Sequence, residues 1–243
     1  MKIGIPQALF FYEYYPFWQT FFEALGCEVV FSNSTCSNML KTGIDITVDD
    51  ACLPIKLYHG HIVELADKVD VIYIPRIISI EQREYICPKF LGLPDMIRSS
   101  IPLLPHIIDT DLNLYKGRFG FYEHAYKVGK ALNKSNYRIL SSYIRALKSL
   151  RNYKSLMVKN KLTPMDIFKA KNKKTPRAKA ETSADKLKVL LLGHHYIIYD
   201  DFMSMSLIDK LRKRNIDLIT CEMLSHNQIQ QGSKRLSKAM FWT

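Results

Sequence analysis

A strand–loop–helix–strand pattern near both ends of the sequence constrains the fold more than any other feature. At the start, the apolar run Lys2–Ile5 predicts a short buried strand. Phe17–Leu25 then predicts an amphipathic helix that ends at Gly26, and Glu28–Phe31 predicts the next strand. Glycine is a common terminator of helices. This order of elements is the building unit of parallel α/β sheets.

The same pattern returns late in the sequence. Lys188–Leu192 predicts a strand, Met203–Lys213 a helix and Asp217–Thr220 a second strand. In both copies a stretch rich in aromatic residues, predicted as a long loop, follows the first strand, at Leu9–Tyr15 and at His195–Asp201. We therefore predict two α/β lobes of related structure.

The chain between the two copies holds further elements. Leu53–Ala66 predicts a helix, and Val69–Ile74 is a continuous apolar run typical of a central parallel strand. Pro75–Phe90 is predicted as a loop at the carboxyl end of that strand, the edge where open α/β sheets bind ligands. Residues 119–160 show helical spacing of apolar positions. Lys169–Lys186 lacks aromatic and branched aliphatic residues, which predicts a linker.

The fold class that follows is α/β, with two Rossmann-like lobes, mainly parallel sheets and a helical middle segment. We predict a first lobe at residues 1–110, a helical segment at 111–168, a basic flexible linker at 169–186 and the start of a second lobe at 187–243. The sequence ends on the apolar stretch Ala239–Thr243, so we expect the second lobe to be truncated there.

The net charge of +12 is unevenly distributed. Residues 1–110 contain 8 basic and 13 acidic side chains, whereas residues 111–168 contain 12 and 3, and residues 169–243 contain 15 and 7. A basic half is typical of an anionic ligand, an acidic partner or nucleic acid, and equally of a solvated lysine-rich surface. The lack of an aromatic-flanked nucleic-acid motif argues against a nucleic-acid partner.

The sequence also indicates a compartment. No apolar run reaches the ~20 residues that span a bilayer, and the amino terminus does not resemble a signal peptide. The five cysteines have irregular spacing, which argues against a disulfide framework. We expect a cytoplasmic protein with no membrane association.

Two cysteine boxes carry the chemistry of the first hundred residues. They read Val48-Asp-Asp-Ala-Cys52-Leu-Pro-Ile-Lys56 and Glu84-Tyr-Ile-Cys87-Pro-Lys89. Both cysteines precede a proline and stand where a helix should begin. The partial positive charge of a helix start favours a thiolate over a thiol. Two converging thiolates would supply half of an iron–sulfur or zinc site, whereas the bland alternative is two part-buried thiols.

Other candidate residues carry weaker signals. Lys56, Arg76 and Lys89 could place positive charge beside a cluster or an anionic ligand. The pair His59-Gly-His61 cannot chelate one metal from a helix, because residues two apart point away from each other. His194 and His195 follow a predicted strand and are candidates for a binding role, set against ordinary surface histidines. The remaining cysteines are interpreted mainly as packing or cap residues: Cys27, Cys36 and Cys221. No nucleotide phosphate-loop motif occurs.

Several of these segments together resemble a known family. The chain resembles the acyl-CoA dehydratase activase-related proteins in five segments. These are Gly4-Ile-Pro-Gln-Ala-Leu, the first cysteine box, the second cysteine box extended through Phe-Leu-Gly-Leu-Pro-Asp-Met-Ile97, Ile74-Pro-Arg-Ile77 and Gly193-His-His-Tyr-Ile-Ile-Tyr199. The proteins of this family are similar to the cluster-bearing subunits of 2-hydroxyacyl-CoA dehydratases. The resemblance spans nearly the whole chain.

The resemblance implies a 4Fe-4S type iron–sulfur protein with Cys52 and Cys87 as cluster ligands, which could be incomplete in this chain. It further implies low-potential electron transfer to a CoA-thioester-type substrate, an ATP-dependent activase as electron donor, and a CoA-ester ligand. A lyase component of the dehydratase type is the enzyme this suggests, and a homo- or heterodimer is a further expectation. The alternatives are a non-catalytic scaffold or partner protein with an incomplete cluster site, and a basic nucleic-acid-associated protein.

Overall fold

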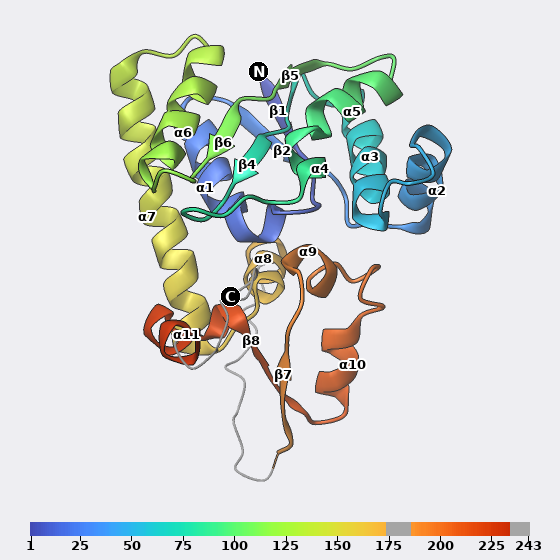
Figure 1. Ribbon diagram of the computed structural model, residues 1–243, viewed down its shortest axis with the longest axis vertical. Coiled ribbons are helices and arrows are strands. Elements are labelled where there is room, and N and C mark those ends of the chain that lie inside the picture. The colour runs from blue at the N-terminus through green and yellow to red at the C-terminus, as the bar shows by residue number, and fades with distance from the viewer. Residues whose placement is uncertain (174–185, 234–243) are drawn as a thin grey trace. The chain divides into compact units, whose positions relative to one another are not determined.

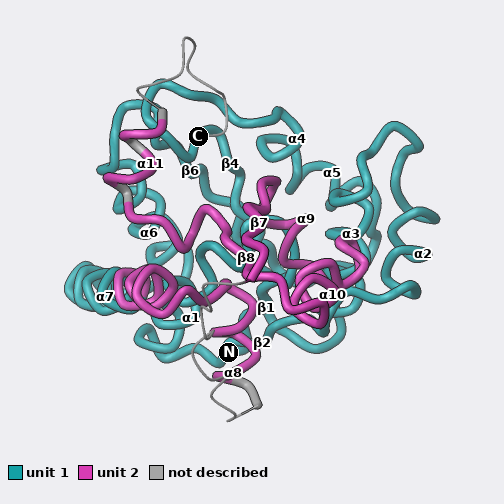
Figure 2. Tube along the Cα trace, turned by 90° about the horizontal axis from the view of Figure 1, so that it is seen from below, with its two compact units in different colours: residues 1–149 teal, residues 150–243 magenta. Residues whose placement is uncertain are grey.

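The computed structural model describes residues 1–173 and 186–233, which fall into two compact units, residues 1–149 and 150–243 (Figure 2). The α/β class with parallel sheets and a helical middle segment is confirmed. Most of the predicted linker at 169–186 and the apolar end at Ala239–Thr243 lie outside the described residues. None of the helices in the described ranges is long and apolar enough to cross a membrane.

The first unit is built on a parallel sheet of four strands. Its order is β2-β1-β3-β5, with β1 at Lys2–Ile5, β2 at Glu28–Phe31, β3 at Val71–Tyr73 and β5 at His106–Ile108 (Figure 1). The chain leaves β1 to form β2 on one side and later returns to form β3 on the other side. This reversal creates a crevice at the carboxyl ends of β1 and β3, where ligands bind in such sheets.

Helix α1 (Phe11–Ala24) connects β1 and β2 and begins earlier than the predicted start at Phe17. Pro16 lies inside the helix and cannot donate the hydrogen bond of that turn. Most of the aromatic stretch predicted as a loop, from Phe11 to Tyr15, forms the first turn of the helix instead, because Phe11, Tyr12 and Tyr15 are buried. Phe17 packs on Phe121 of α6 (Phe119–Ala131) at a centroid distance of 4.7 Å and on Tyr143 of α7 (Asn136–Asn160) at 5.7 Å.

Helices α2 (Ser37–Ile46) and α3 (Leu53–Ala66) approach each other closely through two glycines. A Cβ atom on Gly43 would lie 1.9 Å from the carbonyl oxygen of Lys56, and one on Gly60 would lie 2.2 Å from that of Met39. No side chain fits at either position. The glycine of the His59-Gly-His61 motif therefore serves helix packing.

The stretch Pro75–Phe90, predicted as a loop, contains strand β4 (Arg76–Ser79), which pairs in parallel with β6 (Asp111–Asn113). Along the chain, α4 (Pro88–Leu91) and α5 (Leu93–Ser100) follow β4 and precede β6. Figure 1 shows β4 and β6 side by side. Three or four residues of mixed polarity are too short for an alternation of polar and apolar residues to be recognised, so tertiary pairing defines both strands.

The second unit contains the predicted second copy of the pattern. Strands β7 (Lys188–Leu191) and β8 (Asp217–Thr220) are parallel, and α9 (His195–Ile198) and α10 (Leu207–Lys213) lie between them in sequence. Flanking elements are α8 (Pro164–Lys173), the 3-10 helix η1 (Cys221–Met223) and α11 (His226–Ser233). Arg212 of α10 pairs with the buried Asp166 of α8 through two bonds of 2.8 and 2.6 Å.

Candidate ligand pocket at the carboxyl ends of the strands

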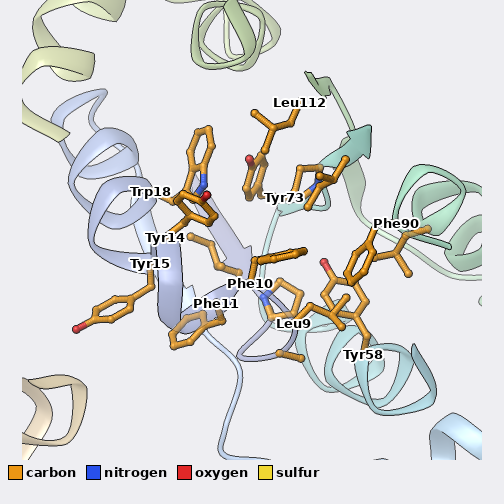
Figure 3. A pocket seen from close by; sticks show the side chains of 16 residues that line it. Leu9, Phe10, Phe11, Tyr14, Tyr15, Trp18, Tyr58, Tyr73, Phe90 and Leu112 are labelled. Atoms are coloured by element: carbon orange, nitrogen blue, oxygen red, sulfur yellow. The ribbon is translucent and has the colours of Figure 1, made fainter. Parts of the chain in front are cut away.

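An aromatic pocket lies in the first unit at the carboxyl ends of β1 and β3 (Figure 3). It encloses about 60 Å³, and its lining contains no ionised side chain. The lining residues come from β1, the β1–α1 loop, α1, α3, β3, the β3–β4 turn, β4, α4, α5 and β6: Ile5, Pro6, Ala8, Leu9, Phe10, Phe11, Tyr14, Tyr15, Trp18, Tyr58, Tyr73, Pro75, Ile77, Phe90, Leu93 and Leu112. The topological switch point therefore carries an apolar cavity.

Both helices that begin at the cysteine boxes contribute to this pocket. Tyr58 comes from α3 and Phe90 from α4, and their side chains face those of Tyr14 and Trp18 from α1 (Figure 3). The ring of Phe90 lies 5.0 Å from that of Phe10, centroid to centroid. The cysteine boxes thus help to build the walls of the pocket, a link that the sequence did not reveal.

The tyrosines of the pocket are neutral. Burial raises the pKa of Tyr14, Tyr58 and Tyr73 above the ordinary phenol value. The hydroxyl of Tyr73 lies 2.7 Å from Nε2 of His124, a ring whose Nδ1 lies 2.9 Å from the carbonyl oxygen of Asp111. This second contact assigns the proton of His124 to Nδ1, so Tyr73 donates to Nε2. Burial lowers the pKa of His124 to about 3, so this ring is neutral as well.

The two cysteine boxes are held against each other. Cys52 is the N-cap residue of α3 and Cys87 that of α4, and both are exposed. Lys89 Nζ donates to the backbone carbonyl of Asp50 at 2.8 Å, which ties the second box to the first. Lys56 Nζ donates to the carbonyl of Asp49, within its own box, at 3.1 Å. Both predicted lysines therefore lie at the boxes.

Arg76 is engaged by carboxylates. Its guanidinium donates to Asp95 at 2.6 and 3.0 Å, to Asp109 at 3.3 Å and to the carbonyl of Leu91 at 3.0 Å. Hydrogen bonds from Arg76 hold the pKa of Asp95 below its ordinary value. The structure thus gives Arg76 a role in joining β4 to α4 and α5. Its role toward an anionic ligand stays a prediction.

The other three cysteines belong to other elements of the chain. Cys27 is buried beside Gly26, and burial raises its pKa. Cys36 is the N-cap residue of α2 and is exposed. Cys221 lies in η1 of the second unit, where burial raises its pKa and the charge of Glu222 adds to the effect.

His61 and His59 are buried within the helix pair. His61 Nδ1 lies 2.8 Å from Ser32 Oγ, and its Nε2 lies 2.9 Å from Thr35 Oγ1. Ser32 Oγ in turn accepts from the backbone N–H of Gln7 at 2.7 Å, so these bonds join the loops that follow β1 and β2. His59 Nδ1 lies 2.8 Å from the carbonyl of Ile55. The expectation that the pair does not chelate a metal stays a prediction.

In the second unit, His195 meets Glu222 at the carboxyl ends of β7 and β8. Its Nε2 lies 2.6 Å from Glu222 Oε1, and the hydroxyl of Tyr199 donates to Oε2 of the same carboxylate. His195 holds the pKa of Glu222 at about 2 despite burial, which acts in the opposite direction. His194 stacks on Tyr196 with centroids 5.0 Å apart. A binding role for the two histidines stays a prediction.

A family model described as "CoA enzyme activase uncharacterised domain" matches residues 2–224, nearly the whole chain. A search of the curated proteins finds no match. The match supports the activase-related part of the resemblance found in the sequence.

The family match shows that the predicted redox function is wrong. We expected an iron–sulfur protein that transfers electrons to a CoA thioester, like a cluster-bearing dehydratase subunit. The matched family is an activase, on the activator side of such a system. Furthermore, residues 1–173 and 186–233 contain no group of three or more histidine, cysteine, aspartate or glutamate side chains that could hold a metal ion.

Proposed function

Because this chain belongs to the family of CoA enzyme activase uncharacterised domains, we propose that its first unit binds the acyl group of a CoA thioester. The observation that carries the proposal is the uncharged aromatic pocket at the switch point of the sheet. Enzymes that use CoA act on thioesters whose acyl part is apolar in most cases. An apolar lining with few polar groups is the usual character of a small-molecule pocket.

The size of the pocket selects the acyl group. An apolar cavity of ~150 Å³ accommodates benzene. The pocket here encloses about 60 Å³, less than half of that value. A short aliphatic chain of a few carbons therefore fits better than an aromatic ring or a long chain.

The partners of the domain form part of the proposal. The resemblance implies an ATP-dependent activase. We keep this activase as a proposed partner, because the sequence contains no phosphate-loop motif for binding a nucleotide itself. The cysteine boxes resemble those of cluster-bearing dehydratase subunits, and we interpret this resemblance as one of fold. A homodimer or a heterodimer with another chain is also part of the proposal.

Calorimetric titration with nucleotide-free thioesters tests the proposal. The full chain is titrated with the butyryl, octanoyl and benzoyl thioesters of N-acetylcysteamine, which carry the acyl group without the nucleotide of CoA. We expect binding of the butyryl thioester that is at least tenfold tighter than that of the other two. Absence of binding for all three, or a preference for the benzoyl thioester, would refute the acyl pocket.

A further inference from the structure

An exposed tyrosine, Tyr85, stacks on a half-buried one, Tyr115, beside the carboxyl ends of β4 and β6. Tyr85 lies in the β4–α4 loop and Tyr115 in the β6–α6 loop. Their ring centroids are 4.7 Å apart and their planes differ by 21°. Tyr85 is 61% exposed. We call this pair the tyrosine platform.

Backbone hydrogen bonds hold the two loops together. The N–H of Arg83 donates to the carbonyl of Tyr115 at 3.1 Å, and that of Leu114 donates to the carbonyl of Ser79 at 3.1 Å. The N–H of Tyr115 donates to the side-chain oxygen of Asn113 at 3.0 Å. These hydrogen bonds join the loops that follow β4 and β6, and they fix the position of one tyrosine ring relative to the other.

Three exposed cations lie within three residues of these tyrosines along the chain: Arg83, Lys116 and Arg118. Within residues 1–173 and 186–233, none of the three side chains forms an ion pair. Two exposed carboxylates, Glu81 and Glu84, lie in the same β4–α4 loop. These five side chains thus carry a net charge of +1, and the cations remain available to an anion.

We propose that the tyrosine platform and these three cations bind the adenine nucleotide part of a CoA thioester. Adenine would stack on the exposed face of Tyr85, because every base offers a flat π-face to an aromatic side chain. The guanidinium and ammonium groups would contact the phosphates. This inference rests on the proposed function, since the acyl pocket identifies the ligand as a CoA thioester.

The platform lies within reach of the acyl pocket. Leu112 lines the pocket, and Tyr115 is the third residue after it. Three residues of extended chain span no more than about 11 Å, which limits the separation of their Cα atoms. In CoA the long pantetheine arm separates the thioester from the nucleotide. One molecule can therefore occupy the pocket and the platform together.

The test is a titration of the full chain with adenosine 3′,5′-bisphosphate, the nucleotide end of CoA, at a fixed salt concentration. We expect Tyr85→Ala to weaken binding at least about fivefold, because base stacking accounts for that much. Tyr85→Phe should retain binding, as it keeps the stacking ring. Tyr137→Ala, which removes another exposed tyrosine on α7, is the matched control and should have no effect.

A second set of variants tests the cations beside the tyrosine platform. Arg83→Gln with Lys116→Gln should weaken binding and reduce its dependence on salt, whereas Arg145→Gln with Lys148→Gln on α7 should leave it unchanged. ATP and 5′-ADP are compared with adenosine 3′,5′-bisphosphate, because all share adenine and phosphates. Tighter binding of ATP would overturn the assignment to CoA. Binding that is insensitive to Tyr85, or no binding at millimolar concentration, would overturn the platform itself.

The two proposals can fail separately. Adenosine 3′,5′-bisphosphate has no acyl group, and the N-acetylcysteamine thioesters have no nucleotide. Binding of the nucleotide without the thioester would refute the acyl pocket alone, and the reverse result would refute the platform alone. When both hold, butyryl-CoA should bind more tightly than either fragment, because the second contact becomes intramolecular.

Discussion

At the scale of single residues, burial decides what each polar side chain in the first unit can do. Tyr58 and Tyr73 line the pocket with phenol pKa values raised by burial, so neither supplies an ionised group there. His61 and His124 are fully buried, and their neutral rings bridge loops and strands through hydrogen bonds. Such a lining suits the proposed apolar group and offers no ionised side chain for acid–base chemistry.

These histidines predict acid sensitivity. Burial lowers the pKa of His61 to about 4 and that of His124 to about 3, whereas histidine in an unfolded chain titrates near ~6.5. Above pH ~6.5 both states are neutral. As the pH falls from ~6.5 toward 4, only the unfolded chain takes up protons, so the free energy of unfolding decreases.

Urea denaturation at pH 7 and pH 5 measures this loss. His61→Gln should make the loss between the two pH values smaller by about 2 kcal/mol, because one shifted histidine has been removed. His106→Gln is the control, since that histidine is exposed. An unchanged loss in the His61→Gln variant would contradict the assignment of a neutral buried ring.

Metal binding by the cysteines is a separate question from the redox function and stays a proposal. Cys52 and Cys87 supply two thiolates, and the described part of the chain offers no group of three or more ligands. We therefore expect iron and acid-labile sulfide below one cluster per chain after anaerobic purification, lost on exposure to air. Cys52→Ala should abolish the iron and Cys27→Ala should not. A full cluster that survives Cys52→Ala would disprove this ligand assignment.

At the scale of elements, the regular βαβ units were predictable and the irregular ones were not. Apolar runs identified β1, β2 and β3. The strands β1 and β3 are buried along most of their length, which explains their apolar sequences, whereas the edge strand β2 is half-buried. The start of α1 was misplaced because Pro16 signals a helix boundary in isolation, whereas here the buried aromatic side chains outweigh one lost hydrogen bond. Strands β4 and β6 depend on a partner distant in sequence.

The pairing of α2 with α3 gives a prediction at this scale. Gly60→Ala should lower the free energy of unfolding by about 2–3 kcal/mol or more, since its Cβ atom would lie 2.2 Å from a backbone oxygen that cannot rotate away. Gly92→Ala is the matched control, because its Cβ atom would lie 3.8 Å from the carbonyl oxygen of Pro88, an ordinary van der Waals distance. Urea denaturation followed by circular dichroism compares the two. Equal stability of both variants would contradict the close approach of α2 and α3.

At the scale of the whole molecule, the order of the elements places the candidate site. Segments scattered from Ile5 to Leu112 meet at one edge of one sheet, and their side chains form the pocket. The sequence showed the aromatic stretch Leu9–Tyr15 and the expected ligand edge separately. It could not show that Tyr58, Phe90 and Leu112 meet there, because that convergence depends on tertiary packing. The cysteines were visible in the sequence, but the pocket beside their helices was not.

The most direct test of the acyl pocket fills it. Ala8→Leu adds a branched side chain to the pocket lining, whereas Ala131→Leu places the same change on the exposed end of α6. Both variants are titrated calorimetrically with the butyryl thioester of N-acetylcysteamine, after circular dichroism has shown that they are folded. We predict that Ala8→Leu weakens binding at least tenfold and that Ala131→Leu binds like the unaltered chain. Undiminished binding by a folded Ala8→Leu variant would contradict the acyl pocket.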